Sequence, residues 1–166
     1  MFTGIVTDIG EIATVAPGGQ AGAKAGDRRF VVRTKHDMKP IAIGASIACS
    51  GCCLTVVEKG GDWFAVEVSG ESLAKTHLGD WAAGSRINLE LSLKLGDELG
   101  GHLVYGHVDG VGEIVARADN ARAVQFTVRA PRELAKYIAH KGSITVDGTS
   151  LTVNAVNGAE FELTIV

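Results

Sequence analysis

The stretch GCCLTV at residues 51–56 returns almost unchanged as GTSLTV at residues 148–153. The match extends backwards, since SIACSGCCLTV from Ser46 aligns with SITVDGTSLTV from Ser143. Further pairs follow in the same order along the chain: GIVTDIGEI with GHVDGVGEI, FVVRT with FTVRA, and WFAVEV with EFELTI. Proteins rich in β-structure share Val, Thr and Gly by chance, but several ordered matches are poorly explained by chance. The sequence therefore predicts an internal duplication.

The duplication divides the chain into two similar units, residues 1–97 and residues 98–166. The first unit is longer between Ile12 and Phe30, where APGGQAGAKAGD is typical of a loose loop. The first WFAVEV is followed by SGESLAKTHLGDWAAGSRINLEL, and no equivalent follows the second copy, which ends at Val166. We therefore expect the second unit to be incomplete.

Short runs of β-branched residues, separated by Gly, Asn and Asp, predict closely spaced strands. EKGGDW and VNGAEF are typical of hairpin turns. Two stretches are predicted to be helical: KHDMKPIAIG, interrupted by Pro40, and PRELAKYIAHKG, which begins at Pro131 and ends at Gly142. The predicted class is all-β: two small antiparallel, Greek-key-like β-barrels in tandem, the second truncated, with short helices between strands.

Composition excludes several functions. The formal net charge is −3 and aromatic residues make up 5%, which disfavours a nucleic-acid-binding surface. No segment resembles a signal peptide and no apolar run is long enough for a membrane helix, so we expect a cytoplasmic protein that binds no membrane. The three cysteines are clustered and odd in number, which does not indicate a disulfide framework.

Matched polar residues occur on the repeated strands. Cys53 aligns with Ser150, and Thr55 aligns with Thr152. Residues two apart on a strand share a face, so each unit is expected to present two small hydrogen-bonding side chains together. Either residue alone would be an ordinary strand residue, but the matched pairs favour two similar binding sites.

Two histidines lie in the glycine-rich stretch GGHLVYGHVDGVG. A histidine can transfer a proton near neutral pH, and His107 stands where the first copy has Ile5. A surface histidine at a strand end is the plainer alternative. His102 precedes the repeated core, which favours a structural role or a place at the domain junction.

The cysteine cluster could have two chemical functions, zinc binding or nucleophilic catalysis. Zinc at Cys49, Cys52 and Cys53 is disfavoured because no second ligand pair exists and adjacent strand residues face opposite sides. A role for Cys53 as a nucleophile is the second alternative, although no base lies beside it in the sequence. We expect no metal.

Five motifs in order, MFTGIV, GASIACSGCCLTV, ESLAKTHLGD, GGHLVYGHVDGVGEI and KGSITVDGTSLTV, together resemble the α-type riboflavin synthase family. The resemblance covers essentially the whole chain. It implies two six-stranded barrels and a C-terminal helix that builds a homotrimer. It also implies a dismutation, without metal or redox cofactor, in which two molecules of 6,7-dimethyl-8-ribityllumazine exchange four carbons to give riboflavin and 5-amino-6-ribitylaminouracil.

The resemblance also implies the site residues. In the first unit they are Phe2, Gly4, Ile5, Val6, Ser46, Cys53, Leu54, Thr55, Glu67, Val68, Ser69, Gly70, Glu71 and Ser72. In the second unit they are His102, Gly106, His107, Val108, Lys141, Ser150, Leu151, Thr152, Ile165 and Val166. The candidates for chemical roles among them are His107, Cys53, Ser150, Thr152, Ser46 and His102.

The mechanistic hypothesis assigns opposite roles to two bound lumazines. One loses a proton from its acidic ring methyl group, and the other accepts a nucleophile at the adjacent ring carbon. His107 is the candidate for proton transfer; Ser150 and Thr152 would position that substrate, and Cys53 and Thr55 its partner. A non-catalytic lumazine-binding antenna protein, with one ligand per chain, is the main alternative. A flavin-reductase-like barrel is disfavoured because no nicotinamide-binding motif is present.

Overall fold

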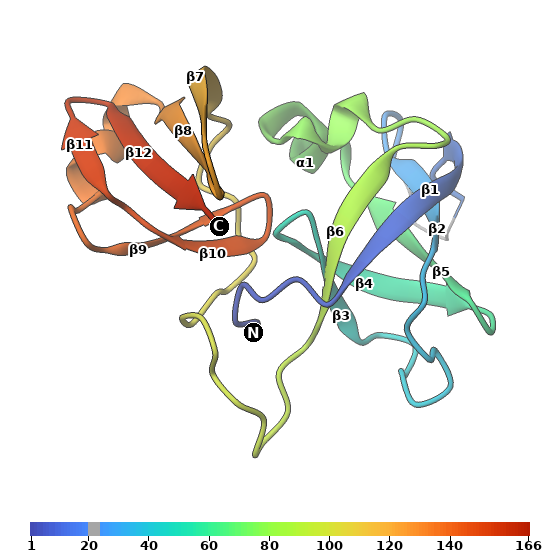
Figure 1. Cartoon of the computed structure of the whole chain (residues 1–166). Coiled ribbons are helices and arrows are strands. Elements are labelled where there is room, and N and C mark those ends of the chain that lie inside the picture. The colour runs from blue at the N-terminus through green and yellow to red at the C-terminus, as the bar shows by residue number, and fades with distance from the viewer. Residues whose placement is uncertain (20–23) are drawn as a thin grey trace.

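The computed structural model describes residues 1–19 and 24–166. It shows two β-rich halves side by side, joined by an extended linker that runs below both of them (Figure 1). The first half is a closed antiparallel barrel with the strand order β1-β2-β5-β4-β3-β6. Its strands are β1 (Asp8–Pro17), β2 (Arg28–Arg33), β3 (Ser46–Cys49), β4 (Cys52–Lys59), β5 (Trp63–Val68) and β6 (Arg86–Leu91).

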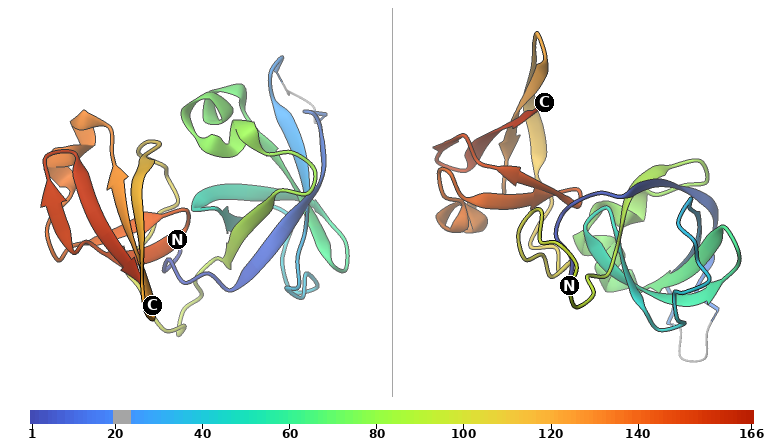
Figure 2. Two further views of the ribbon diagram at one scale, coloured as in Figure 1. Left: turned by 45° about the horizontal axis from the view of Figure 1, so that its top comes forward. Right: turned by 60° about the horizontal axis from the view of Figure 1, so that its bottom comes forward.

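Apolar residues from all six strands meet inside the ring seen in Figure 2, and their burial stabilises the closed barrel. On β4, Leu54 and Val56 are buried in this core. Cys53 and Thr55 point to the opposite face, where Thr55 is exposed and Cys53 is half-buried. The expected alternation on the repeated strand is confirmed.

The second half repeats the strand arrangement without closing. β11 (Ala155–Asn157), β12 (Glu160–Ile165), β8 (Ala123–Arg129) and β7 (Glu113–Asn120) form a four-stranded sheet in that order. β9 (Ser143–Val146) and β10 (Thr149–Thr152) form a separate hairpin. In the part of the chain that the structure describes, no strand joins β7 to β9 as β6 joins β1 to β3. The core here is smaller and centres on Phe161 and Leu163. The all-β prediction with tandem repeats is confirmed.

The helices differ from those predicted. KHDMKPIAIG forms turns, in which the Lys59 ammonium donates to the carbonyls of Met38 at 2.6 Å and Lys39 at 3.0 Å. PRELAKYIAHKG gives only the short 3₁₀ helix η2 (Arg132–Tyr137). Two helices were not predicted: α1 (Gly70–Lys75), which begins after the N-cap Ser69, and the 3₁₀ helix η1 (His77–Asp80).

The loop expected between Ile12 and Phe30 is shorter than predicted because β1 continues to Pro17. Part of that expectation, residues 20–23, lies outside the described residues. Among the helices described, none has the length and apolar character needed to cross a membrane.

Candidate functional site

Two segments outside the barrels pair with each other at the boundary between the halves. We call residues 1–5 the N-terminal segment and residues 102–108 the linker segment. Phe2 and Val104 form an antiparallel bridge, with backbone hydrogen bonds of 2.7 and 3.0 Å. Both side chains are buried together with Ala48, and Cys53 packs against them. The two segments are therefore anchored to the first barrel as one unit.

Each segment crosses to the other half. The Ser150 N–H donates to the carbonyl of Gly4 at 2.7 Å, and the Cys53 N–H donates to the carbonyl of Gly106 at 2.8 Å. Both glycines have positive φ, +77° and +79°. A Cβ on Gly4 would lie 2.6 Å from the Ser150 Cβ, and one on Gly106 would lie 2.7 Å from the Cys53 Cβ. Each site is therefore assembled from both halves.

The repeated glycine that opens GCCLTV and GTSLTV has a structural purpose. Both hairpin turns place two successive residues at positive φ: Ser50 and Gly51 in one, Asp147 and Gly148 in the other. This is the backbone of a tight type I′ hairpin. The turns also touch, since a Cβ on Gly51 would lie 2.7 Å from the Gly148 nitrogen. The two hairpins therefore meet tip to tip.

A hollow of about 260 Å³ lies beside the first hairpin. Residues from β4, from α1 and its C-cap, and from the linker segment line it: Cys52, Cys53, Glu71, Ser72, Lys75, Thr76, Gly106, His107 and Val108. Cys53 and His107 thus share one site. The sequence hypothesis had grouped His107 with Ser150 and Thr152. That grouping needs correction, because the linker segment crosses onto the first barrel and carries His107 with it.

The histidine beside Ser150 is His102. Its Nδ1 lies 2.7 Å from the Ser150 Oγ, and its Nε2 lies 3.0 Å from the Thr145 Oγ1. Thr145 and Ser150 are direct partners in the β9–β10 ladder, so their side chains share a face. Sequence reasoning missed Thr145, although its place opposite Ser150 across a tight hairpin could have revealed it. Thr152 is exposed on the same face of β10.

The remaining predicted site residues fall in varied environments. Ser46 is the ladder partner of Thr55, Ile5 is exposed and Val6 is half-buried. Leu54 and Val68 are buried in the barrel core, and Leu151 packs against the second core. Glu67 lies near Arg29 and accepts from the Gly19 N–H, Ser69 caps α1, and Gly70 donates to Asp27. Lys141 is exposed at positive φ, and Ile165 and Val166 are exposed at the end of the chain.

The cysteines have distinct environments. Cys49 and Cys52 are buried, and Cys53 is partly exposed. Burial raises the pKa of the Cys52 thiol to about 11, with a further contribution from Cys53, and burial raises the pKa of Cys49 as well. Cys53 is therefore the accessible thiol. Within residues 1–19 and 24–166, no group of three His, Cys, Asp or Glu side chains is arranged to hold a metal.

A contact between the halves includes a titratable pair. The Asp147 carboxylate lies 3.3 Å from the His77 Nε2 and accepts from the Asn88 amide at 3.0 Å. The hydrogen bond to Asp147 raises the pKa of His77, and the charge of Asp80 adds to the effect. The β9–β10 turn is thereby fastened to the first half.

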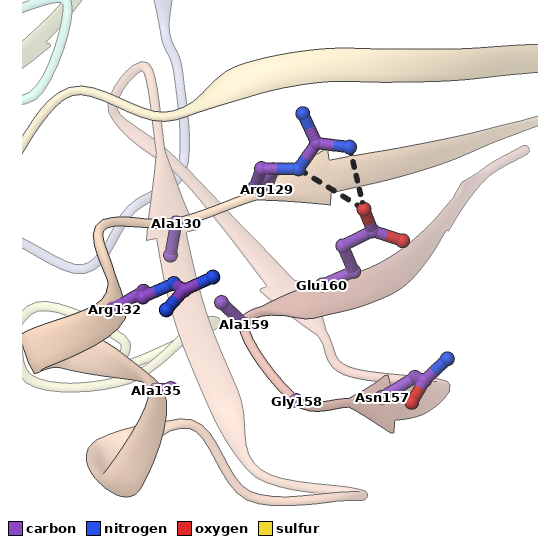
Figure 3. A pocket seen from close by; sticks show the side chains of 8 residues that line it. All are labelled: Arg129, Ala130, Arg132, Ala135, Asn157, Gly158, Ala159 and Glu160. Atoms are coloured by element: carbon purple, nitrogen blue, oxygen red, sulfur yellow. Dashed lines mark hydrogen bonds and ion pairs between the residues drawn. The ribbon is translucent and has the colours of Figure 1, made fainter.

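A larger hollow, about 630 Å³, lies at the far end of the second half, between η2 and the β11–β12 turn (Figure 3). Small residues form much of it, including Ala130, Ala135 and Ala159. Arg129 is held by Glu160 through two bonds of 3.0 and 2.8 Å. None of the predicted site residues is among those that line this hollow.

Comparisons with known proteins show the family of the chain. The family model described as "Lumazine binding domain" matches residues 3–92 and 105–166. The chain is 54% identical to a riboflavin synthase of Brucella abortus, over 100% of this chain and 82% of that protein. It is 40% identical to a riboflavin synthase of Photobacterium phosphoreum, over 100% of this chain and 74% of that protein.

The fold is also similar to a solved structure, LumP complexed with riboflavin. The TM-score is 0.86 at 21% identity, covering 99% of this chain and 86% of that one. At that identity the likeness concerns the fold alone. The duplicated hairpins, the exchanged segments and the full-length similarity to the relatives lead to one conclusion: the chain belongs to the riboflavin synthase family, with two lumazine-binding repeats.

Proposed function

We propose that the chain is a transferase that converts two molecules of 6,7-dimethyl-8-ribityllumazine into riboflavin and 5-amino-6-ribitylaminouracil. A four-carbon unit leaves one lumazine and joins the other, so the atoms balance without an added oxidant or reductant. The observation that carries the proposal is the reciprocal pair of hydrogen bonds, Ser150 to Gly4 and Cys53 to Gly106. Two like sites joined in this manner suit two copies of one substrate.

The two binding units of this proposal are residues 1–97 and 98–166, each completed by the segment that crosses from the other. Cys53, Ser72 and His107 line the hollow that would hold the first ligand, and Thr55 lies exposed on the same face of β4 as Cys53. Ser150 and Thr152, which share a face of β10, would contact the second ligand. The opposed roles of the substrates would follow from these different side chains.

His107 and His102 are the proton-transfer candidates, one for each site. His107 is exposed at the rim of the smaller hollow. His102 is half-buried and bridges Ser150 and Thr145, which fixes its ring in one orientation. Orientation of two substrates can itself supply about 7–11 kcal/mol in favourable model reactions, so neither histidine has to be indispensable.

The proposal extends to a homotrimer in the cytoplasm, as the family resemblance implies. The apolar side chains of Leu95, Leu99, Leu103 and Tyr105 are exposed along the linker, which supports an assembly face there. Light scattering coupled to size-exclusion chromatography would measure the number of chains.

The direct experiment is incubation with ribityllumazine while riboflavin absorbance is recorded, together with a titration of ligand per chain. We expect riboflavin to form and two ligands to bind. One ligand per chain without riboflavin would instead indicate a lumazine carrier. His107→Ala is expected to lower turnover more than it weakens lumazine binding, and unchanged turnover would remove His107 from the mechanism.

A further inference from the structure

Glu90 is a buried carboxylate outside the two sites. It lies on β6 with 6% of its surface exposed. One oxygen accepts from the Thr3 N–H and the Thr3 hydroxyl, both at 2.6 Å, and the other accepts from the Gly4 N–H at 2.9 Å. Burying a carboxylate is costly unless it is well hydrogen-bonded, and here three donors converge on it. The carboxylate of Glu90 thus fixes the N-terminal segment to the barrel through three hydrogen bonds.

The two residues that donate to Glu90, Thr3 and Gly4, also form hydrogen bonds with residues of the second site. The carbonyl of Thr3 accepts from the His102 N–H at 3.0 Å, and the carbonyl of Gly4 accepts from the Ser150 N–H at 2.7 Å. Thr3 and Gly4 therefore donate to Glu90 and accept from His102 and Ser150. The first barrel is connected to the second hairpin through two residues.

This connection leaves little freedom. Gly4 has φ +77°, and its Cα packs against Ser150 closely enough to exclude a side chain. A Cβ on Gly101 would meet the Thr3 carbonyl oxygen. A shift of the Thr3–Gly4 peptides therefore moves the backbone of Ser150 and that of His102, whose side chains lie 2.7 Å apart.

We propose that Glu90 is a positioning residue for the second site: its carboxylate sets the Thr3–Gly4 peptides and, through them, the Ser150–His102 pair. This inference rests on the proposed function, because it assigns Glu90 a role in that reaction without contact to substrate. Small displacements of reacting groups can cost about 100-fold in rate, so a distant anchor can matter for turnover.

The test is a double-mutant cycle between Glu90→Gln and Ser150→Ala. The glutamine keeps the size of the side chain but replaces one acceptor oxygen with an NH₂ group, which cannot accept from Thr3 or Gly4. We expect Glu90→Gln to lower kcat about ten-fold in the otherwise native chain, with KM changed less. In the Ser150→Ala background it should lower kcat less than about two-fold, because the effect passes through Ser150.

A matched control is Glu58→Gln, which alters an exposed glutamate on β4 that pairs with Arg29. It is expected to leave kcat unchanged. Thr3 supplies an independent series: Thr3→Ser keeps the hydroxyl and should retain turnover, whereas Thr3→Val removes one of the three donors and should fall between native and Glu90→Gln. This series remains informative if Glu90→Gln does not fold.

Equal effects of Glu90→Gln in both backgrounds would overturn the proposal and leave Glu90 a purely structural residue, as would unchanged kcat in Glu90→Gln. Failure of the proposed function looks different, because the native chain itself would then form no riboflavin. In that case the double-mutant cycle would measure riboflavin affinity, by fluorescence titration, in place of kcat. Coupled losses of affinity support positioning, and additive losses contradict it.

Discussion

The backbone N–H of Ser150 donates to the carbonyl of Gly4 at 2.7 Å, across the boundary between the two halves. Cys53 and Gly106 repeat the contact at 2.8 Å in the opposite direction. The N-terminal segment, which precedes the first half, therefore contacts the second half. The linker segment, which precedes the second half, contacts the first. A change in either half is therefore expected to affect the site of the other.

The crossing glycines provide the first prediction. Gly4→Ala and Gly106→Ala each place a methyl group within 3 Å of the opposing strand at positive φ. A left-handed residue costs about 1–2 kcal/mol, and overpacking adds about 1–3 kcal/mol, so each variant should be several kcal/mol less stable. Gly61→Ala is the control, since nothing lies within 4 Å of its Cβ position. Urea unfolding measures the difference, and equal midpoints for all three variants would contradict the crossing geometry.

Filling the smaller hollow should remove one ligand. Ser72→Phe adds an aromatic ring among Cys53, His107 and the other residues that line the 260 Å³ space. We expect binding of ribityllumazine to fall from two per chain to one, measured by fluorescence titration. Ala135→Phe places the same ring in the larger hollow of about 630 Å³ and should leave two ligands bound. If Ala135→Phe alone lost a ligand, the binding site would have to be assigned to the larger hollow instead.

Selective alkylation tests the accessibility of Cys53. Iodoacetamide reacts with the thiolate, and burial disfavours that form at Cys49 and Cys52 by raising their pKa values. Peptide mapping by mass spectrometry should therefore find a single label, on Cys53, and bound riboflavin should slow the reaction. All three cysteines should react only after unfolding. Labelling of Cys49 in the folded protein would show that the core opens.

The His77–Asp147 pair predicts a pH-dependent stability. The pKa of His77 is raised above its ordinary 6.5, mainly by the hydrogen bond to Asp147 and also by the charges of Asp147 and Asp80. The stabilisation is then complete below about pH 6.5 and disappears as the pH rises through the raised value. The native chain should exceed His77→Gln in Tm at about pH 6, and this difference should shrink as the pH rises above that range. Because both side chains are substantially exposed, the difference should be small, roughly 0.2–1 kcal/mol.

Asp147→Asn is the complementary variant, because it removes the carboxylate but keeps an oxygen that can accept from Asn88. It should lose the same pH dependence as His77→Gln. A difference between native and variant that grows toward alkaline pH has the wrong sign and would refute the assignment.

The strands and their faces could be predicted because period-two alternation is a local property. It placed Cys53 and Thr55 on one side of β4 and Leu54 on the other. The partner of each histidine could not be predicted in this way. His107 and His102 lie close in sequence, yet the linker segment delivers one to Cys53 and the other to Ser150, and only the tertiary crossing decides between them.

The helix predictions failed for a related reason. Pro40 interrupts the 35–44 stretch, which forms turns whose carbonyls at Met38 and Lys39 accept from Lys59 on β4. α1 has weak periodicity over its six residues and begins at a cap, Ser69, whose side chain accepts from the Ser72 N–H. Such short helices depend more on capping and packing than on pattern.

The contact between Gly51 and Gly148 limits how far the sequences of the two copies can diverge at these turns. A side chain added at either turn would strike the backbone of the opposite one, at 2.7 or 2.8 Å. Two positions further on, Cys53 and Ser150 carry side chains of different chemistry without disturbing that contact. The two turn glycines therefore constrain each other, whereas side chains two residues further along the strands can differ between the copies.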